Sequence, residues 1–135
     1  MSRPTLESLA ATTSSHELFA IFCYPLASFQ GPDTPGGRDA FHAHFIYLDK
    51  LRTAGKLVFA GPINLPVPGQ PPVHTPGALE GMIIIRAADK KEAEKIAFED
   101  PYHAHGQRRN DVHTWLLAWS HNELTPKLAA TFSKI

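Results

Sequence analysis

The chain has 135 residues, and its 13 Lys and Arg balance its 13 Asp and Glu, so the formal net charge is zero. No basic stripe indicates nucleic acid or an anionic membrane surface as a partner, and no apolar run approaches the roughly 20 residues that span a bilayer. The N-terminus lacks the apolar core of a secretory signal, and the single cysteine, Cys23, cannot form an intrachain disulfide. These features predict a small cytoplasmic protein.

The predicted elements alternate between strands and helices. Apolar runs rich in aromatic and β-branched residues predict four strands, over residues 17–24, 56–61, 78–87 and 110–120. Apolar positions at helical spacing predict a helix over 39–54, which Gly55 ends. Asp89 and Glu92 form a capping-box pattern at the start of a second helix over 89–98. Proline and glycine indicate irregular structure in three longer segments, residues 25–37, 62–77 and 99–109.

The order strand, helix, strand, strand, helix, strand predicts an α+β, ferredoxin-like βαββαβ domain over 17–120. Its four-stranded antiparallel sheet would carry both helices on one face. Because the strands read as apolar on both sides, the other face would be bare and apolar, which favours a homodimer through that face. Residues 1–16 form an N-terminal extension in this interpretation, and residues 121–135 form a C-terminal tail or a short helix.

This topology brings the three long irregular segments to one end of the sheet. Loops that a rigid scaffold positions are where binding and catalysis are usually found. Six polar residues are therefore expected near this rim: His42, His44, His74, Asp100, His103 and His105.

Two His-Ala-His pairs, in "FHAHF" (41–45) and "YHAHG" (102–106), stand out. A helix turns about 100° per residue, so His42 and His44 point apart and cannot bind one metal ion together. His44 shares the apolar side of its helix, whereas His42 faces water. Asp100 precedes a proline, where it is either a turn residue or an acceptor that orients a histidine.

The second pair is open to another interpretation. His103 and His105 lie in an irregular segment, and together with His74 they could form a three-nitrogen zinc site. Nothing in the spacing enforces that arrangement, so we expect neither a metal nor a cofactor.

Three parts of the chain resemble the YCII-related family: "HFIYLDKLRTAGKLVFAGP" (44–62), "GALEGMIIIRAADKKEAEKIAFEDPY" (77–102) and Gly106. The resemblance implies a dimeric α+β barrel with a histidine and an aspartate facing a cleft, which correspond to His44 and Asp100. The family includes a dehydrochlorinase that acts on a chlorinated hydroxyhydroquinone, which implies small ring compounds as substrates. An arginine commonly stands in the family where this chain has Phe41, and Arg38 could substitute for it.

The sequence thus favours a cofactor-independent enzyme in which His44 and Asp100 form an acid/base dyad, with isomerase or dehydrochlorinase/lyase-like chemistry. The residues expected to contact a small cyclic or aromatic substrate are Arg38, Phe41, Tyr47, Tyr102, His103 and His105. The alternative is a non-enzymatic dimeric protein that binds a small ligand. The two hypotheses differ in that a catalytic His44 must open onto a cavity.

Overall fold

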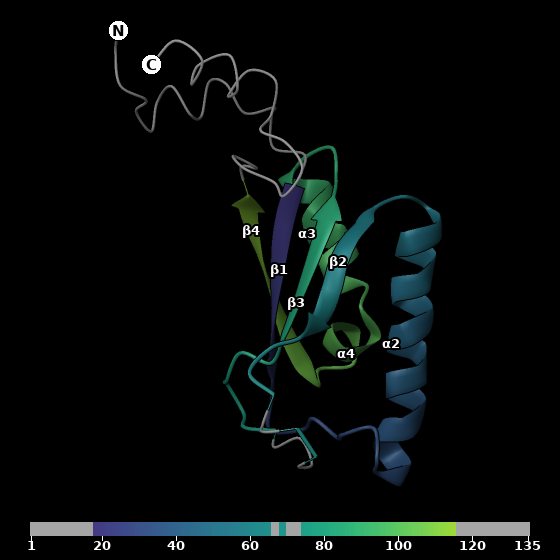
Figure 1. The fold of residues 1–135 in the computed structure, drawn as a ribbon, viewed down its shortest axis with the longest axis vertical. Coiled ribbons are helices and arrows are strands. Elements are labelled where there is room, and N and C mark those ends of the chain that lie inside the picture. Colours follow the sequence, from purple (N-terminus) through teal and green to yellow (C-terminus); the bar gives the residue numbers. More distant parts are fainter. Residues whose placement is uncertain (1–17, 66–67, 70–73, 116–135) are drawn as a thin grey trace, which may run out of the picture.

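The computed structural model describes residues 18–65, 68–69 and 74–115 (Figure 1). It contains, in chain order, β1 (Leu18–Pro25), α2 (Pro35–Thr53), β2 (Leu57–Pro62), β3 (Gly81–Arg86), α3 (Lys90–Phe98), α4 (Pro101–Ala104) and β4 (Arg108–Trp115). The predicted N-terminal extension, the predicted C-terminal tail and the expected end of the last strand lie outside the described residues. None of the helices in the described part is long and apolar enough to cross a membrane.

The four strands form one sheet in the order β2-β3-β1-β4, and every neighbouring pair is antiparallel. Phe19 of β1 pairs with Ile85 of β3 on one side and with Thr114 of β4 on the other. This order, with the two crossover helices, is the ferredoxin-like arrangement, so the predicted fold class is confirmed.

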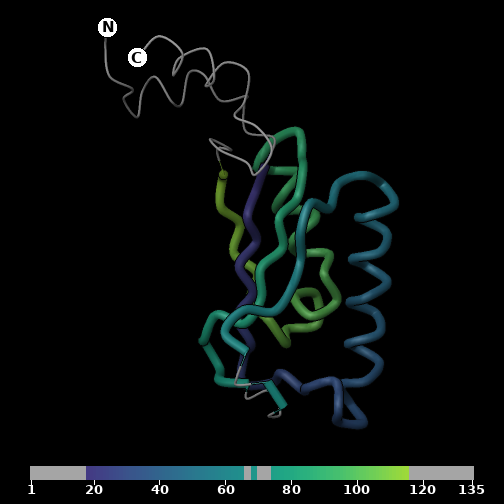
Figure 2. The backbone as a smooth tube through the Cα atoms, in the orientation of Figure 1, coloured from purple at the N-terminus to yellow at the C-terminus, as the bar shows by residue number. Residues whose placement is uncertain are grey.

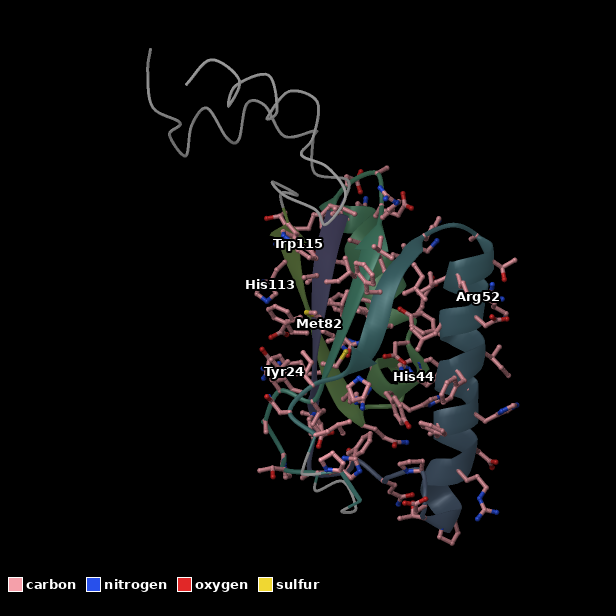
Figure 3. All side chains as sticks on the ribbon, in the orientation of Figure 1. Tyr24, His44, Arg52, Met82, His113 and Trp115 are labelled. Carbon is pink, nitrogen blue, oxygen red and sulfur yellow. The ribbon has the colours of Figure 1, made fainter. Side chains whose placement is uncertain are left out.

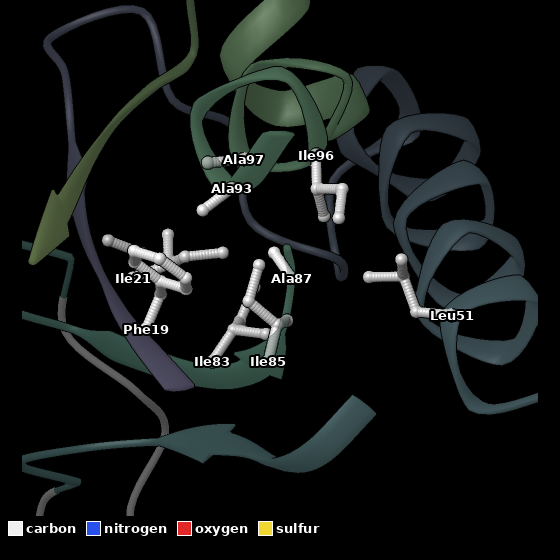
Figure 4. Close-up of a cluster of buried hydrophobic side chains, with 10 residues drawn as sticks. Phe19, Ile21, Leu51, Ile83, Ile85, Ala87, Ala93, Ile96 and Ala97 are labelled. Carbon is white, nitrogen blue, oxygen red and sulfur yellow. The ribbon is translucent and has the colours of Figure 1, made fainter. Parts of the chain in front are cut away.

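The hydrophobic core lies between the sheet and the helices, because alternate residues of the central strands point to the helical side (Figure 4). The strands contribute Phe19, Ile21, Cys23, Ile83 and Ile85, the α3 side contributes Ala87, Ala93, Ile96 and Ala97, and α2 contributes Leu51. The small alanines let α3 approach the sheet closely. Leu51 sits near the C-terminal end of α2, so this end of the helix is anchored in the core.

Helix α2 begins earlier than predicted, at Pro35 rather than at Asp39. Proline is well tolerated at the first helical position, and the Thr34 hydroxyl caps the helix by accepting from the Gly37 N–H at 2.9 Å. A side chain at position 37 would collide with the Gly31 carbonyl, so the glycine is needed there. The helix ends as predicted, since Gly55 takes the left-handed conformation at φ 73°.

The segment predicted to be irregular over 99–109 instead contains the short helix α4, and β4 starts at Arg108 rather than at Asn110. Pro101 does not break α4, because it occupies the first turn, where its missing N–H has no helical partner. The Asp100 carboxylate caps the helix by accepting from the Tyr102 N–H at 3.2 Å.

The sheet face opposite the helices is less apolar than predicted. Phe22 and Met82 are half-buried there, and Phe59 of β2 is 67% exposed. Along β4, however, the same face carries polar residues, among them Asp111 and His113. The expectation that all four strands are apolar on both sides was therefore wrong for β4.

The predicted gathering of irregular segments at one end of the sheet is confirmed, and the backbone trace shows it at the lower end (Figure 2). The segment after β1 bonds to the turn after α4 through Leu26 N–H to the Gln107 carbonyl, at 2.9 Å, and through the Ser28 hydroxyl to the Gly106 carbonyl, at 2.7 Å. The segment before β3 joins them, because the Gly77 N–H donates to the Pro25 carbonyl at 2.8 Å.

Candidate active site

A cavity of about 380 Å³ lies between α2 and the sheet. Helix α2 packs against β2 and α4, and Figure 1 shows it alongside β2. The lining residues from α2 are Phe41, His44, Phe45 and Leu48, and those from the sheet side include Cys23, Gly61, Met82, Ile83 and Arg108. The cavity is therefore mostly apolar with a few polar groups, which is typical of small-molecule sites.

His44 lies on the side of α2 that faces the sheet (Figure 3), and its side chain is 12% exposed. Its Nδ1 is 2.8 Å from Oδ1 of Asp100, whose side chain is completely buried. The two residues come from the middle of a long helix and from the cap of a short one, and both helices are held by their own caps. The structure thus brings together the histidine and the aspartate that the sequence singled out.

Three donors surround the Asp100 carboxylate. Besides His44, the Tyr102 N–H donates to Oδ1 at 3.2 Å and the Asn110 amide donates to Oδ2 at 3.0 Å. Burial by itself would raise the pKa of Asp100. The hydrogen bond and charge of His44, followed by the bonds from Asn110 and Tyr102, outweigh it and lower the pKa below its ordinary value. Asp100 is therefore an ionised, buried carboxylate at neutral pH.

The charge of Asp100 fixes the tautomer of the neutral His44 ring. An ionised carboxylate only accepts hydrogen bonds, so the hydrogen must be on Nδ1 of His44. Nε2 is then the nitrogen that can take up a proton. Because His44 lines the cavity, this arrangement can carry out proton transfer with a bound molecule.

Two tyrosines flank the pair. The Tyr102 ring centroid is 4.9 Å from that of His44, and the Tyr102 side chain is buried. The Tyr47 hydroxyl donates to the Ile96 carbonyl at 2.6 Å and so ties α2 to α3. Burial, and after it the negative charge of Asp100, raises the pKa of Tyr47, so its hydroxyl stays protonated and remains a donor. Tyr47 thus lies beside His44 and helps to hold α2 against α3, and its predicted contact with a substrate stays a prediction.

The other residues predicted to bind substrate are distributed unevenly. Phe41 lines the cavity, whereas Arg38 is exposed on the first turn of α2 and does not line it. His103 stacks on Phe98 and accepts from the Asn110 N–H at 3.1 Å, and His105 is exposed at the end of α4. Their contact with a substrate stays a prediction.

A second cavity, of about 210 Å³, adjoins the first, and Phe41, Pro62, Glu80 and Arg108 line both. His74 lines the second cavity, and its Nδ1 lies 2.9 and 3.0 Å from the two carboxylate oxygens of Glu80. From the sequence, His74 was predicted as a residue of this rim and as a possible metal ligand, whereas Glu80, Arg108 and Asn110 were missed. These residues belong to no motif, and only their position at the loop-bearing end of the sheet could have indicated them.

The predicted alternative of a zinc site formed by His74, His103 and His105 is not supported. His74 is paired with Glu80, and His103 accepts a hydrogen bond from the Asn110 N–H. Within residues 18–65, 68–69 and 74–115, no three His, Cys, Asp or Glu side chains come together as a metal site.

Cys23 also lines the larger cavity, but its thiol is not activated. Burial, with a smaller contribution from the Asp100 charge, raises its pKa to about 12, although the Arg108 charge acts in the opposite direction. The thiolate is the nucleophilic form of cysteine, so Cys23 does not supply a nucleophile here.

Comparison with known proteins agrees with this architecture. No curated protein matches the chain significantly. One solved structure that is similar in fold is 5-chloro-2-hydroxyhydroquinone dehydrochlorinase from Burkholderia phenoliruptrix AC1100, in complex with 2,5-dihydroxybenzoquinone. The match has a TM-score of 0.50 and 23% sequence identity, and it covers 73% of this chain and 92% of that chain. The family model described as "YCII-related domain" matches residues 18–115, which is most of the chain. The chain therefore belongs to the YCII-related domain family.

Proposed function

We propose that the protein is a cofactor-independent enzyme in which His44 and Asp100 act as an acid/base dyad on a small cyclic or aromatic substrate. One observation carries this proposal. His44, whose Nδ1 lies 2.8 Å from Oδ1 of the buried Asp100, also lines a cavity of about 380 Å³. A purely structural histidine would be sealed from such a cavity.

The roles of the two residues follow from their chemistry. His44 Nε2 takes a proton from a hydroxyl or an acidic carbon of the substrate, and Asp100 stabilises the imidazolium that forms. In an isomerisation, the same nitrogen returns the proton to another atom of the substrate. In a dehydrochlorination, the electron pair released by deprotonation expels chloride, and the proton stays on His44 until water removes it.

The apolar lining supports a ring compound as the substrate. Phe41, Phe45 and Leu48 of α2 face Ala60 and Ile83 of the sheet across the cavity. A planar ring fits between such walls, and the similar dehydrochlorinase was solved with a dihydroxybenzoquinone bound. Hydroxylated and chlorinated hydroxylated rings are therefore the compounds to test first.

The test of the dyad is the tautomer of His44, read from long-range ¹H–¹⁵N NMR spectra at a pH where the ring is neutral. We expect the hydrogen on Nδ1 in the wild type and a shift toward Nε2 in Asp100→Asn. His44→Gln should lower turnover of an active ring compound by roughly 10²–10⁴-fold. His42→Gln, on the exposed side of the same helix, is the matched control and should keep full activity.

The opposite result favours the non-enzymatic alternative. If ring compounds bind in the cavity without being turned over, and the His44 tautomer is the same in Asp100→Asn, the dyad proposal is wrong. The protein would then be a small-ligand-binding protein that uses the same cavity.

We also propose that the protein is a homodimer through the sheet face opposite the helices. Phe59 is 67% exposed on this face, next to the half-buried Phe22 and Met82, and a second copy would cover them. Sedimentation velocity should give a dimer that Phe59→Glu converts to a monomer. Ile46→Glu, at an exposed apolar position on α2, should leave the dimer intact, and a monomeric wild type would contradict the proposal.

A further inference from the structure

Arg108 occupies a position that the proposed dyad does not use. It is the first residue of β4 and lines both the cavity of about 380 Å³ and the adjoining one of about 210 Å³. Its positive charge also reaches Cys23 and Tyr102, because it acts to lower the pKa of both groups. A cation therefore stands at the junction of the two cavities, on the same side of the sheet as His44.

The Arg108 guanidinium lies against two aromatic rings, whereas its Nε donor has no hydrogen-bond partner among the described residues. The group lies 4.6 Å from the centroid of the Tyr102 ring and 5.1 Å from that of Phe29, so aromatic rings hold it in place. A contact with aromatic rings does not use up the N–H donors of a guanidinium as a hydrogen bond to an oxygen would, so these donors can still bind an acceptor. The Phe29 and Tyr102 rings thus hold the Arg108 guanidinium in place, with its donors still able to bind a ligand.

Arg108 lacks an anionic partner in the described part of the chain. Its Nε is buried and has no hydrogen-bond partner among the described residues, and none of the ion pairs found there includes Arg108. A buried donor without a partner is costly, and native proteins rarely retain one without a reason. An acceptor oxygen from a bound molecule would remove this cost.

The carboxylate that lines both cavities together with Arg108 is already engaged. Glu80 lines both cavities as Arg108 does, but both of its carboxylate oxygens are within 3.0 Å of His74 Nδ1. The His74 ring in turn packs edge-on against Phe29, with centroids 4.7 Å apart. This arrangement holds Glu80 on His74 and leaves the Arg108 edge available.

We propose that Arg108 binds an anionic oxygen, a carboxylate or a phenolate, of a planar ring ligand whose ring lies in the larger cavity beside His44. This inference rests on the proposed function in one respect, that the ligand occupies the same cavity. It narrows the substrate class to ring compounds that carry a negative charge, and it assigns Arg108 a binding and orienting role. An enolate or phenolate that forms when His44 removes a proton would be stabilised by the same group.

The test compares benzoate with benzamide, two rings of similar shape that differ in charge, in calorimetric titrations of the full-length protein. We expect benzoate to bind the wild type at least about tenfold more tightly, because a hydrogen bond to a charged group is worth that much. Arg108→Met keeps the apolar stem and should remove the preference. Arg109→Met is the matched control and should retain it, because Arg109 stacks on Tyr24 and pairs with Asp111.

A second measurement does not depend on the Arg108→Met variant folding. Benzoate, but not benzamide, should shift the Nε–H signal of Arg108 in NMR spectra of the wild type. Equal affinities for the two probes, or an unshifted Nε–H signal, would overturn the proposal. Failure of the dyad proposal would give a different result. The wild type would still bind benzoate more tightly than benzamide, but the His44 tautomer would be the same in the wild type and in Asp100→Asn.

Discussion

The molecule contains two histidine–carboxylate pairs of nearly equal length in very different surroundings. His44 Nδ1 lies 2.8 Å from Asp100, and His74 Nδ1 lies 2.9 Å from Glu80. The side chains of the first pair are 12% and 0% exposed, whereas those of the second are 28% and 14% exposed. His44 lines the larger cavity, and both His74 and Glu80 line the smaller one, so neither the distance nor the presence of a cavity distinguishes the two pairs.

The difference lies in what holds each carboxylate. Asp100 caps α4 and accepts from three donors, those of His44, Tyr102 and Asn110. Asn110 is in turn fixed by a bond from its amide to the Ala97 carbonyl, at 2.9 Å. A carboxylate with this many donors keeps its charge and its orientation, and it therefore dictates the tautomer of its histidine. The two pairs are therefore alike in their His–carboxylate distance and differ in the donors behind the carboxylate.

The two pairs are expected to differ most in how much each contributes to the free energy of unfolding. Asp100→Ala removes the acceptor of three donors in a buried site, and we expect it to lower the free energy of unfolding by about 3 kcal/mol. Glu80→Ala breaks a more exposed pair, and we expect a loss below about 1 kcal/mol. Urea unfolding of both variants measures the difference. Equal losses would mean that the network around Asp100 contributes nothing beyond the ion pair.

A smaller effect is expected in acid. The pKa of Asp100 is lower in the folded protein than the ordinary value of 3.8, so its stabilisation is complete above that value and is lost as the pH falls through the lowered one. As the pH falls from about 6 to below 3.8, the wild type should therefore lose more stability than Asp100→Asn.

The control for this experiment is Asp49→Asn, which removes an exposed carboxylate from α2. Its acid unfolding curve should stay close to that of the wild type. If Asp100→Asn and the wild type lose the same stability in acid, Asp100 is not a buried ion in the folded protein.

Several features of the fold could be predicted from local sequence because they depend on residues close together in the chain. The apolar runs of β1 and β3, the helical spacing around His44 and the stop at Gly55 are of this kind. The start of α2 at Pro35 and the helix α4 were missed. In both places proline and glycine indicated a loop, whereas a capping side chain and the proline's place in the first turn allow a helix.

The sequence by itself determined the order of the four strands and of the two crossover helices, and this order determined that the irregular segments meet at one end of the sheet. It also singled out His44 by its position on an apolar helix side and Asp100 by its place before a proline, and the family resemblance selected the same two. These inferences need only periodicity, turn chemistry and topology.

The tertiary structure alone decided how the side chains at that end are paired. Asn110 donates to Asp100 from β4, Glu80 pairs with His74, and Arg108 is left at the junction of the two cavities beside Tyr102 and Phe29. Neither periodicity nor any motif marks these residues, because their roles come from contacts between strands, loops and helices that are distant in the chain. How firmly each histidine is oriented depends on the donors packed around its carboxylate, and only the folded chain brings those donors together.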